Sequence, residues 1–308
     1  MKISRNLKMS AIMMTLVAPW LIAFVAVADL PGRTLATTGA PRAVVIDRSA
    51  MDTAEGFGVS AQDGPIVIDH NAVDAGAIPQ AWLDAARQQV VFFNHRSIGN
   101  NILDGVADLA LQNPTRYSIN VVYGHGTGEG INHYMAGENG KPLDKISGFS
   151  GLVKDGHDIA FMKFCVGDFP PWTIVSPDDI WSAYRDAMEN LQAQHPNTVI
   201  VWWTSPLTSP ADGRGLEHFA TFNALVRQYV AENGGVLFDI ADIESHDLSG
   251  DPVTSGGYEA MYNDYSDDGA HLNETGRQRV ASAIWWLLAR VAGWEGMTHS
   301  NYLPIVLK

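Results

Sequence analysis

The chain has 308 residues and carries 34 Asp and Glu against 20 Lys and Arg, a formal net charge of −14 at pH 7. This acidic balance disfavours nucleic acid and anionic membrane surfaces as partners, because both repel a negative protein. The single cysteine, Cys165, cannot form an internal disulfide, so the hydrophobic core must hold the fold. Its place in an apolar stretch predicts a buried structural thiol.

The first 28 residues have the pattern of a secretory signal. Lys2, Arg5 and Lys8 precede an apolar run over residues 11–28, which ends in an Ala-x-Ala cleavage sequence. The run is also about long enough to span a bilayer, so an uncleaved anchor is the alternative. Pro19 and the Ala-x-Ala ending favour cleavage. We therefore expect a secreted, periplasmic or cell-surface protein with no stable membrane insertion after cleavage.

Residues 29–79 are rich in Gly, Ala, Pro, Thr and Asp and contain only short apolar runs, at 43–46 and 65–68. This composition predicts a mostly irregular N-terminal extension that lies against the domain near its end. Residues 80–308 are then long enough to form one domain with its own core.

Short apolar runs alternate with helical patterns from residue 81 onward. Buried strands are predicted at 90–93, 118–123, 158–162, 198–203 and 235–239, and helices at 81–88, 98–111, 178–194, 217–233 and 275–291. Strands divided by helices of this length predict an α/β fold, a three-layer flavodoxin-like sandwich with a mostly parallel central sheet. Ligands of such sheets bind beyond the carboxyl ends of the strands.

Two polar segments carry residues that suit a hydrolase. Ser97 follows the strand at 90–93, and Asp268 and His271 lie three residues apart ahead of the last helix. A serine hydroxyl becomes nucleophilic when an imidazole takes its proton and a carboxylate holds the other ring nitrogen. Taken singly, Ser97 or Asp268 could cap the helix that follows, and His271 could be a surface histidine. Their ordered combination favours a catalytic triad.

These motifs resemble the SGNH hydrolase family, also called GDSL-type esterases and lipases. The resemblance spans about residues 90–291 and is most specific at 267–281, Asp-Asp-Gly-Ala-His-Leu-Asn-Glu-Thr-Gly-Arg-Gln-Arg-Val-Ala, which is similar to the terminal block of the family. It implies Ser97 as nucleophile, His271 as base and Asp268 as its orienting acid. Together with export, it implies hydrolysis of a short acyl ester, such as an acetyl group on a polysaccharide, without a cofactor. An acyltransferase with a sugar acceptor and an inactive secreted binding module are the alternatives.

The sequence departs from the family pattern in two places. Arg96 stands where the family has an acid before the serine, so the electrostatics near the nucleophile must differ. Gly167 stands at the family's oxyanion asparagine, so that amide donor is missing. We predict an oxyanion hole built from the backbone N–H groups of Ser97 and Gly137 and the side chain of Asn139. Asn139 as a simple turn residue is the alternative.

Three further residues are predicted to contact the substrate. His125 lies in a glycine-rich run that has no Gly-Lys-Ser/Thr ending and so matches a phosphate loop poorly. Trp172 follows Pro170-Pro171 in a loop past a strand. Lys163 lies in a buried strand, where pairing with Asp168 is the alternative.

Further histidines and tryptophans give weaker signals. His133 is a further candidate substrate contact, and Trp202 and Trp203 lie in a strand covered on both faces, which favours core packing. No compact metal-binding motif is formed by the spacing of Asp69, His70, His125 and His133, so no metal is predicted.

Overall fold

The computed structural model describes residues 64–296. The predicted signal at 1–28 and most of the predicted extension lie outside the described residues. Contacts divide the chain into two units, Met1–Thr53 and Ala54–Lys308, and only the second contains described residues. Within residues 64–296, no helix is both long and apolar enough to cross a membrane.

A seven-stranded sheet forms the centre of the domain, with all of its pairings parallel. Its strand order is β1-β7-β6-β5-β2-β4-β3. The strands are β1 Ile66–Ile68, β2 Val90–Asn94, β3 Val121–Tyr123, β4 Gly130–Tyr134, β5 Ile159–Met162, β6 Val199–Trp203 and β7 Val236–Phe238. The five predicted strands are present, and the predicted three-layer α/β class is confirmed. The prediction of a buried strand at 118–123 is wrong in one respect, because β3 lies at the end of the sheet and all three of its residues are exposed.

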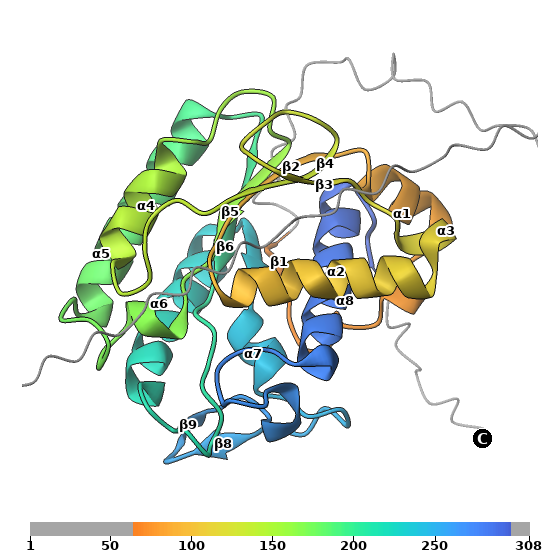
Figure 1. The fold of residues 1–308 in the computed structure, drawn as a ribbon. Coiled ribbons are helices and arrows are strands. Elements are labelled where there is room, and N and C mark those ends of the chain that lie inside the picture. The colour runs from red at the N-terminus through yellow and green to blue at the C-terminus, as the bar shows by residue number, and fades with distance from the viewer. Residues whose placement is uncertain (1–63, 297–308) are drawn as a thin grey trace, which may run out of the picture. The chain divides into compact units, whose positions relative to one another are not determined.

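Helices cover both faces of this sheet, as parallel strands require (Figure 1). Helices α1, α2 and α8 pack together on one face, and α4, α5 and α6 lie on the other. The helices are α1 Gln80–Ala86, α2 Ile98–Gln112, α3 Pro114–Tyr117, α4 Pro142–Ser150, α5 Pro177–Gln194, α6 Leu216–Asn233, α7 Ile240–Glu244 and α8 Glu274–Val291. A small antiparallel hairpin, β8 Thr254–Ser255 and β9 Tyr258–Glu259, lies outside the main sheet.

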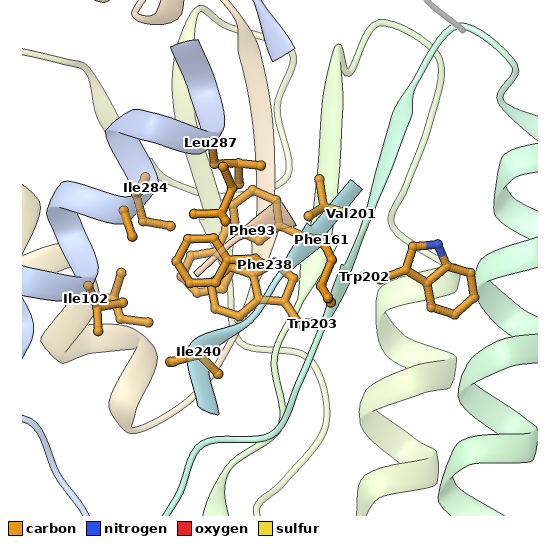
Figure 2. Packing of buried hydrophobic residues seen from close by; sticks show 14 of the residues in the cluster. Phe93, Ile102, Phe161, Val201, Trp202, Trp203, Phe238, Ile240, Ile284 and Leu287 are labelled. Carbon is orange, nitrogen blue, oxygen red and sulfur yellow. The ribbon is translucent and has the colours of Figure 1, made fainter. Parts of the chain in front are cut away.

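A row of four aromatic rings crosses the sheet on the α2 and α8 face (Figure 2). Phe93, Phe161, Trp203 and Phe238 come from four adjacent strands, and their successive ring centroids lie 4.9, 5.1 and 4.1 Å apart. Trp202 points to the opposite face, where its ring centroid lies 4.5 Å from that of Tyr229 in α6. The alternation of adjacent side chains along a strand explains this division. Both tryptophans are at most 1% exposed, so they belong to the core.

The sheet extends beyond the predicted strands on both sides. Residues 66–68, placed in the irregular extension by the sequence, form β1, which pairs with β7 from Ile66↔Val236 to Ile68↔Phe238. The sheet-bearing part of the chain therefore begins before residue 80. The unpredicted strand β4 lies between β2 and β3, and its sequence Gly-Ile-Asn-His-Tyr lacks the apolar run that marked the others.

Candidate active site

Ser97 lies in a strained turn between β2 and α2. It is the only non-glycine residue with positive φ among residues 64–296, with φ 51° and ψ −107°. The turn is held by the Gly99 N–H, which donates to the Arg96 carbonyl at 3.0 Å, and by the Asn100 N–H, which donates to the Ser97 carbonyl at 2.7 Å. Such backbone strain costs about 1–3 kcal/mol and is typical of functional sites.

His271 reaches Ser97 from the loop that precedes α8. The Ser97 Oγ and the His271 Nε2 lie 2.5 Å apart. On the other side of the ring, the His271 Nδ1 lies 2.7 Å from an Asp268 carboxylate oxygen. With the serine donating to Nε2, Nδ1 carries the proton that it donates to Asp268, which is the tautomer that a general base requires. Folding thus joins residues 174 positions apart in a continuous hydrogen-bonded chain.

The alternative structural roles of these residues do not match the contacts. Ser97 stands at the N-cap of α2, yet its side chain makes no capping hydrogen bond. The cap of α8 is Asn273, whose side chain accepts from the Gly276 N–H at 3.2 Å, so Asp268 is not a cap. His271 is 52% exposed but is bonded on both ring nitrogens.

Asp268 is held in its ionised form by several donors. Partial burial raises the pKa of this carboxyl. Hydrogen bonds from the His271 N–H, the His271 ring and the Ala270 N–H together lower it by more than burial raises it, so the pKa lies well below the usual range. The two backbone bonds are 2.7 and 2.9 Å long. The carboxylate is therefore negative wherever a hydrolase works and is placed to stabilise an imidazolium on His271.

Arg96, the departure from the family pattern, fastens the loop after β4 beside the nucleophile turn. Its guanidinium donates to the carbonyl oxygens of Gly137 and Met135. Asn94 at the end of β2 makes two hydrogen bonds with Ala136. Its side-chain amide donates to the Ala136 carbonyl, and its side-chain oxygen accepts from the Ala136 N–H. The predicted oxyanion residue Gly137 is thus tied to the Ser97 turn, while its part in an oxyanion hole stays a prediction.

Asn139 has a partner that sequence reasoning missed. Its side-chain oxygen accepts a hydrogen bond from the Lys145 ammonium at 2.8 Å. Lys145 also pairs with Asp168, and both side chains are almost fully buried. This leaves the Asn139 amide nitrogen with no acceptor among the described residues, so a role as an oxyanion donor stays a prediction.

Lys163 does not lie where a substrate could reach it. Its side chain is fully buried, and its ammonium donates to the Phe164 carbonyl at 2.7 Å and to the Cys165 sulfur at 3.3 Å. The prediction of substrate contact is therefore wrong, and the alternative of a pair with Asp168 fails because Lys145 takes that place. Burial lowers the pKa of Lys163. Cys165 is buried and free, as predicted.

His125 and Trp172 lie on the surface, in different settings. His125 is exposed and packs edge-on against Tyr134, whose carbonyl accepts from the His95 N–H near the nucleophile turn. Trp172 is partly exposed and stacks on Phe219, and the Arg214 guanidinium lies 5.1 Å from its ring centroid. Both substrate roles stay predictions.

His133 is partly buried and pairs with a buried histidine beside the nucleophile turn, and its contact with a substrate stays a prediction. Its Nδ1 lies 3.0 Å from the Nε2 of His95, which is 1% exposed and two residues before Ser97. Burial lowers the pKa of both rings, and for His95, with help from nearby positive groups such as Lys163, the value falls to about 3. The His95 ring is therefore neutral near pH 7.

A third histidine cluster lies apart from the triad residues. His70, just after β1, meets Asp242 and His246 around helix α7, and the candidate ligand atoms of the three side chains all lie within 4.8 Å of one another. His70 and Asp242 are 172 positions apart in the sequence, so residue spacing alone cannot reveal this cluster. Only the Asp242 to His246 interval of four residues hints at it.

The structure therefore places a hydrogen-bonded chain of Ser97, His271 and Asp268 beyond the carboxyl end of the interior strand β2. No protein-family model matches the chain, and no curated protein matches it. Several solved structures do, at low identity. A GDSL-like lipase from Bacteroides thetaiotaomicron matches with 12% identity and a TM-score of 0.47, over 70% of this chain and 94% of its own.

Two carbohydrate-directed proteins are similar at the same level. The acetyl xylan esterase AlAXEase matches with 18% identity and a TM-score of 0.45, over 63% of this chain and 97% of its own. A carbohydrate esterase family 3 protein from Talaromyces cellulolyticus matches with 14% identity and a TM-score of 0.41, over 66% and 96%. At this similarity, function is best argued from the side chains of the site.

Proposed function

We propose that this protein is a serine esterase that hydrolyses short acyl esters through an acyl-enzyme on Ser97. The observation that carries the proposal is the hydrogen-bonded chain from the Ser97 hydroxyl through His271 to Asp268. The strained turn supports it as well, because its cost of about 1–3 kcal/mol serves no evident structural purpose at this position.

The chemistry follows from the contacts. The Ser97 oxygen attacks the ester carbonyl while His271 Nε2 takes the hydroxyl proton, and Asp268 stabilises the resulting imidazolium. The oxyanion that forms lies near the N-terminus of α2, whose partial positive charge favours it, and the N–H groups of Ser97 and Gly137 are the proposed donors. His271 then returns the proton to the leaving alkoxide, and water repeats the cycle to release the acid.

A short acyl group on a bulky alcohol is the proposed substrate. His271 and Asp268 are 52% and 58% exposed, so the acid–base pair meets solvent directly. An open pair of this kind leaves room for a large leaving group, such as an acetylated glycan. Export through the signal at 1–28, also a proposal, would bring the enzyme to extracellular glycans, and sequencing the N-terminus of the mature protein tests it.

Hydrolysis of p-nitrophenyl acetate, butyrate and octanoate by the full chain tests the activity and the acyl length. We expect the acetate to be preferred and Ser97→Ala to lose the activity. Ser182→Ala is the matched control, because this exposed serine of α5 only bonds the Asp178 carbonyl. Equal rates in wild type and Ser97→Ala would dismiss the assignment.

Labelling with a fluorophosphonate distinguishes the enzyme from an inactive binding module. Only an activated serine reacts with this probe, so wild type and Ser182→Ala should be labelled and Ser97→Ala should not. An unlabelled wild-type protein would favour the binding module. Acyl transfer to an added glycan in place of water would identify an acyltransferase that uses the same intermediate.

A further inference from the structure

The cluster of His70, Asp242 and His246 has no part in the proposed esterase chemistry. His70 follows edge strand β1, whereas Asp242 and His246 lie in and just after α7. The His70 Nδ1 lies 2.5 Å from one Asp242 carboxylate oxygen, and the His246 Nδ1 lies 3.7 Å from the other. The His246 Nδ1 also donates to the Asp242 carbonyl oxygen at 2.8 Å, a bond that an ion at this nitrogen would replace. Two imidazoles and a carboxylate from two separate segments thus offer ligand atoms within 4.8 Å of one another.

From this arrangement we infer that His70, Asp242 and His246 form a binding site for a divalent transition-metal cation such as Zn²⁺. Zinc bonds of about 2.0–2.2 Å at tetrahedral angles place ligand atoms about 3.4 Å apart. The gaps of 2.5 and 3.7 Å to the Asp242 carboxylate lie on either side of that spacing. An ion would replace the proton between His70 and Asp242, and the side chains would rotate to bring their ligand atoms to this spacing.

The donor set selects the class of cation. Two neutral imidazoles and one carboxylate suit zinc, copper or nickel, whereas calcium and magnesium prefer sites made of oxygen ligands. The three side chains are 24%, 21% and 14% exposed, so solvent can supply the remaining ligand and the ion has a path of entry.

The surrounding contacts already orient the ligands. The His70 N–H donates to an Asp242 carboxylate oxygen at 2.9 Å, which fixes the loop after β1. The two imidazole rings stack with centroids 3.7 Å apart and planes 14° from parallel. Because a metal ion lies in the plane of each imidazole that binds it, at least one ring must turn out of this stack when the ion binds. The Tyr265 hydroxyl donates to the His246 carbonyl at 2.9 Å and holds that residue from the side of the loop before α8.

The ion would link the end of β1 to α7 and so stabilise the edge of the sheet. Strand β1 is three residues long and lies at the edge of the sheet, where it pairs only with β7. A metal bridge from His70 to Asp242 closes a loop of 172 positions, and such a closure restricts the unfolded chain strongly. Bound metal is therefore expected to raise the thermal midpoint, independently of the triad.

The test uses the full chain, stripped with a chelator and titrated with ZnCl₂ by calorimetry. We expect one saturating equivalent in the wild type, and His246→Ala should weaken the affinity by about tenfold or more. His195→Ala is the matched control, because the His195 and Asp155 pair, 2.9 Å apart, has no third ligand among the described residues. Zinc should raise the thermal midpoint of the wild type and of His195→Ala, but not of His246→Ala.

Three results would overturn the site: no saturable binding by the wild type, equal affinity in His246→Ala, or loss of binding in His271→Ala, which would place the ion at the triad. Circular dichroism verifies that His246→Ala is folded. If that variant is not folded, X-ray absorption spectroscopy of the wild-type protein with one equivalent of zinc counts the imidazole ligands. The proposed site requires two of them, and a smaller number would reject it.

Discussion

The Lys145 ammonium and the Asp168 carboxylate form an ion pair inside the protein, with side chains only 1% and 0% exposed. Asp168 also accepts from the Gly140 N–H at 2.9 Å and the Cys165 N–H at 2.7 Å. One carboxylate thus joins α4, the loop after β4 and the turn after β5. These segments flank Ser97, so the pair supports the shape of the proposed oxyanion region.

Replacing Lys145 with Met should destabilise the protein by about 3–5 kcal/mol, because it leaves the Asp168 charge buried without its partner. Urea unfolding at neutral pH measures the change. The double variant Lys145→Met with Asp168→Leu should recover much of the loss, since no uncompensated charge remains. A single variant within about 1 kcal/mol of wild type would contradict the importance of the pair.

Asp268→Asn should lower kcat by about 10³–10⁴-fold, because an amide cannot stabilise the imidazolium or hold the same His271 tautomer. Hydrolysis of p-nitrophenyl acetate measures it. Asp267→Asn is the control, since the neighbouring carboxylate bonds Asn273 at 3.1 Å and not the histidine. Similar losses in the two variants would show that the effect comes from the loop as a whole.

Glu244 should make the stability depend on pH. Burial raises the pKa of this carboxyl to about 8, against smaller lowering effects of the Leu207 N–H and the Lys163 charge. Because its unfolded pKa is about 4.3, the folded state holds the extra proton between these values. Stability is therefore greatest below the unfolded pKa and falls as pH rises towards 8, by up to about 1.4 kcal/mol per pH unit.

The variant Glu244→Gln removes this dependence, since its amide oxygen can accept from Leu207 but carries no titrating proton. Urea unfolding at pH 5, 6.5 and 8 should show the variant gaining on the wild type as pH rises. Parallel pH profiles of the two proteins would mean that the carboxyl does not titrate in this window.

Gly105→Ala should destabilise the contact between α2 and α8 by about 1–3 kcal/mol through overpacking. A Cβ atom there would lie 2.2 Å from the Arg277 carbonyl oxygen, which belongs to the backbone and cannot move aside alone. Gly128→Ala is the control, because nothing lies within 4 Å of its Cβ position. Thermal unfolding compares the two, and equal midpoints would show that the helices shift apart at little cost.

Much of the fold was predictable because four of the five predicted strands are buried apolar runs, a signal that local sequence carries. The strand β4 was missed because Asn132 and His133 interrupt its apolar pattern; Asn132 is nonetheless buried, with its amide donating to the Gly128 carbonyl at 2.7 Å. Tertiary contacts that satisfy polar groups in this way cannot be inferred from periodicity. The same limit applies to β1, whose pairing with β7 is a long-range contact.

The triad positions could be proposed because Asp268 and His271 lie on one short loop and Ser97 follows a recognisable strand. The supports around them could not. The sequence indicates no role for Lys145 and predicts that Lys163 contacts a substrate, yet both are buried. Which lysine meets Asp168 depends on how α4 packs against β5, and that is decided by the whole core.

The backbone at Ser97 limits how robust this protein can become. Glycine would adopt the same conformation without the cost of about 1–3 kcal/mol, but it has no hydroxyl. Alanine loses the hydroxyl and keeps the backbone strain, so Ser97→Gly should have a higher thermal midpoint than Ser97→Ala. Adaptation to hotter surroundings must therefore draw on other parts of the molecule, because relief at this residue would end its chemistry.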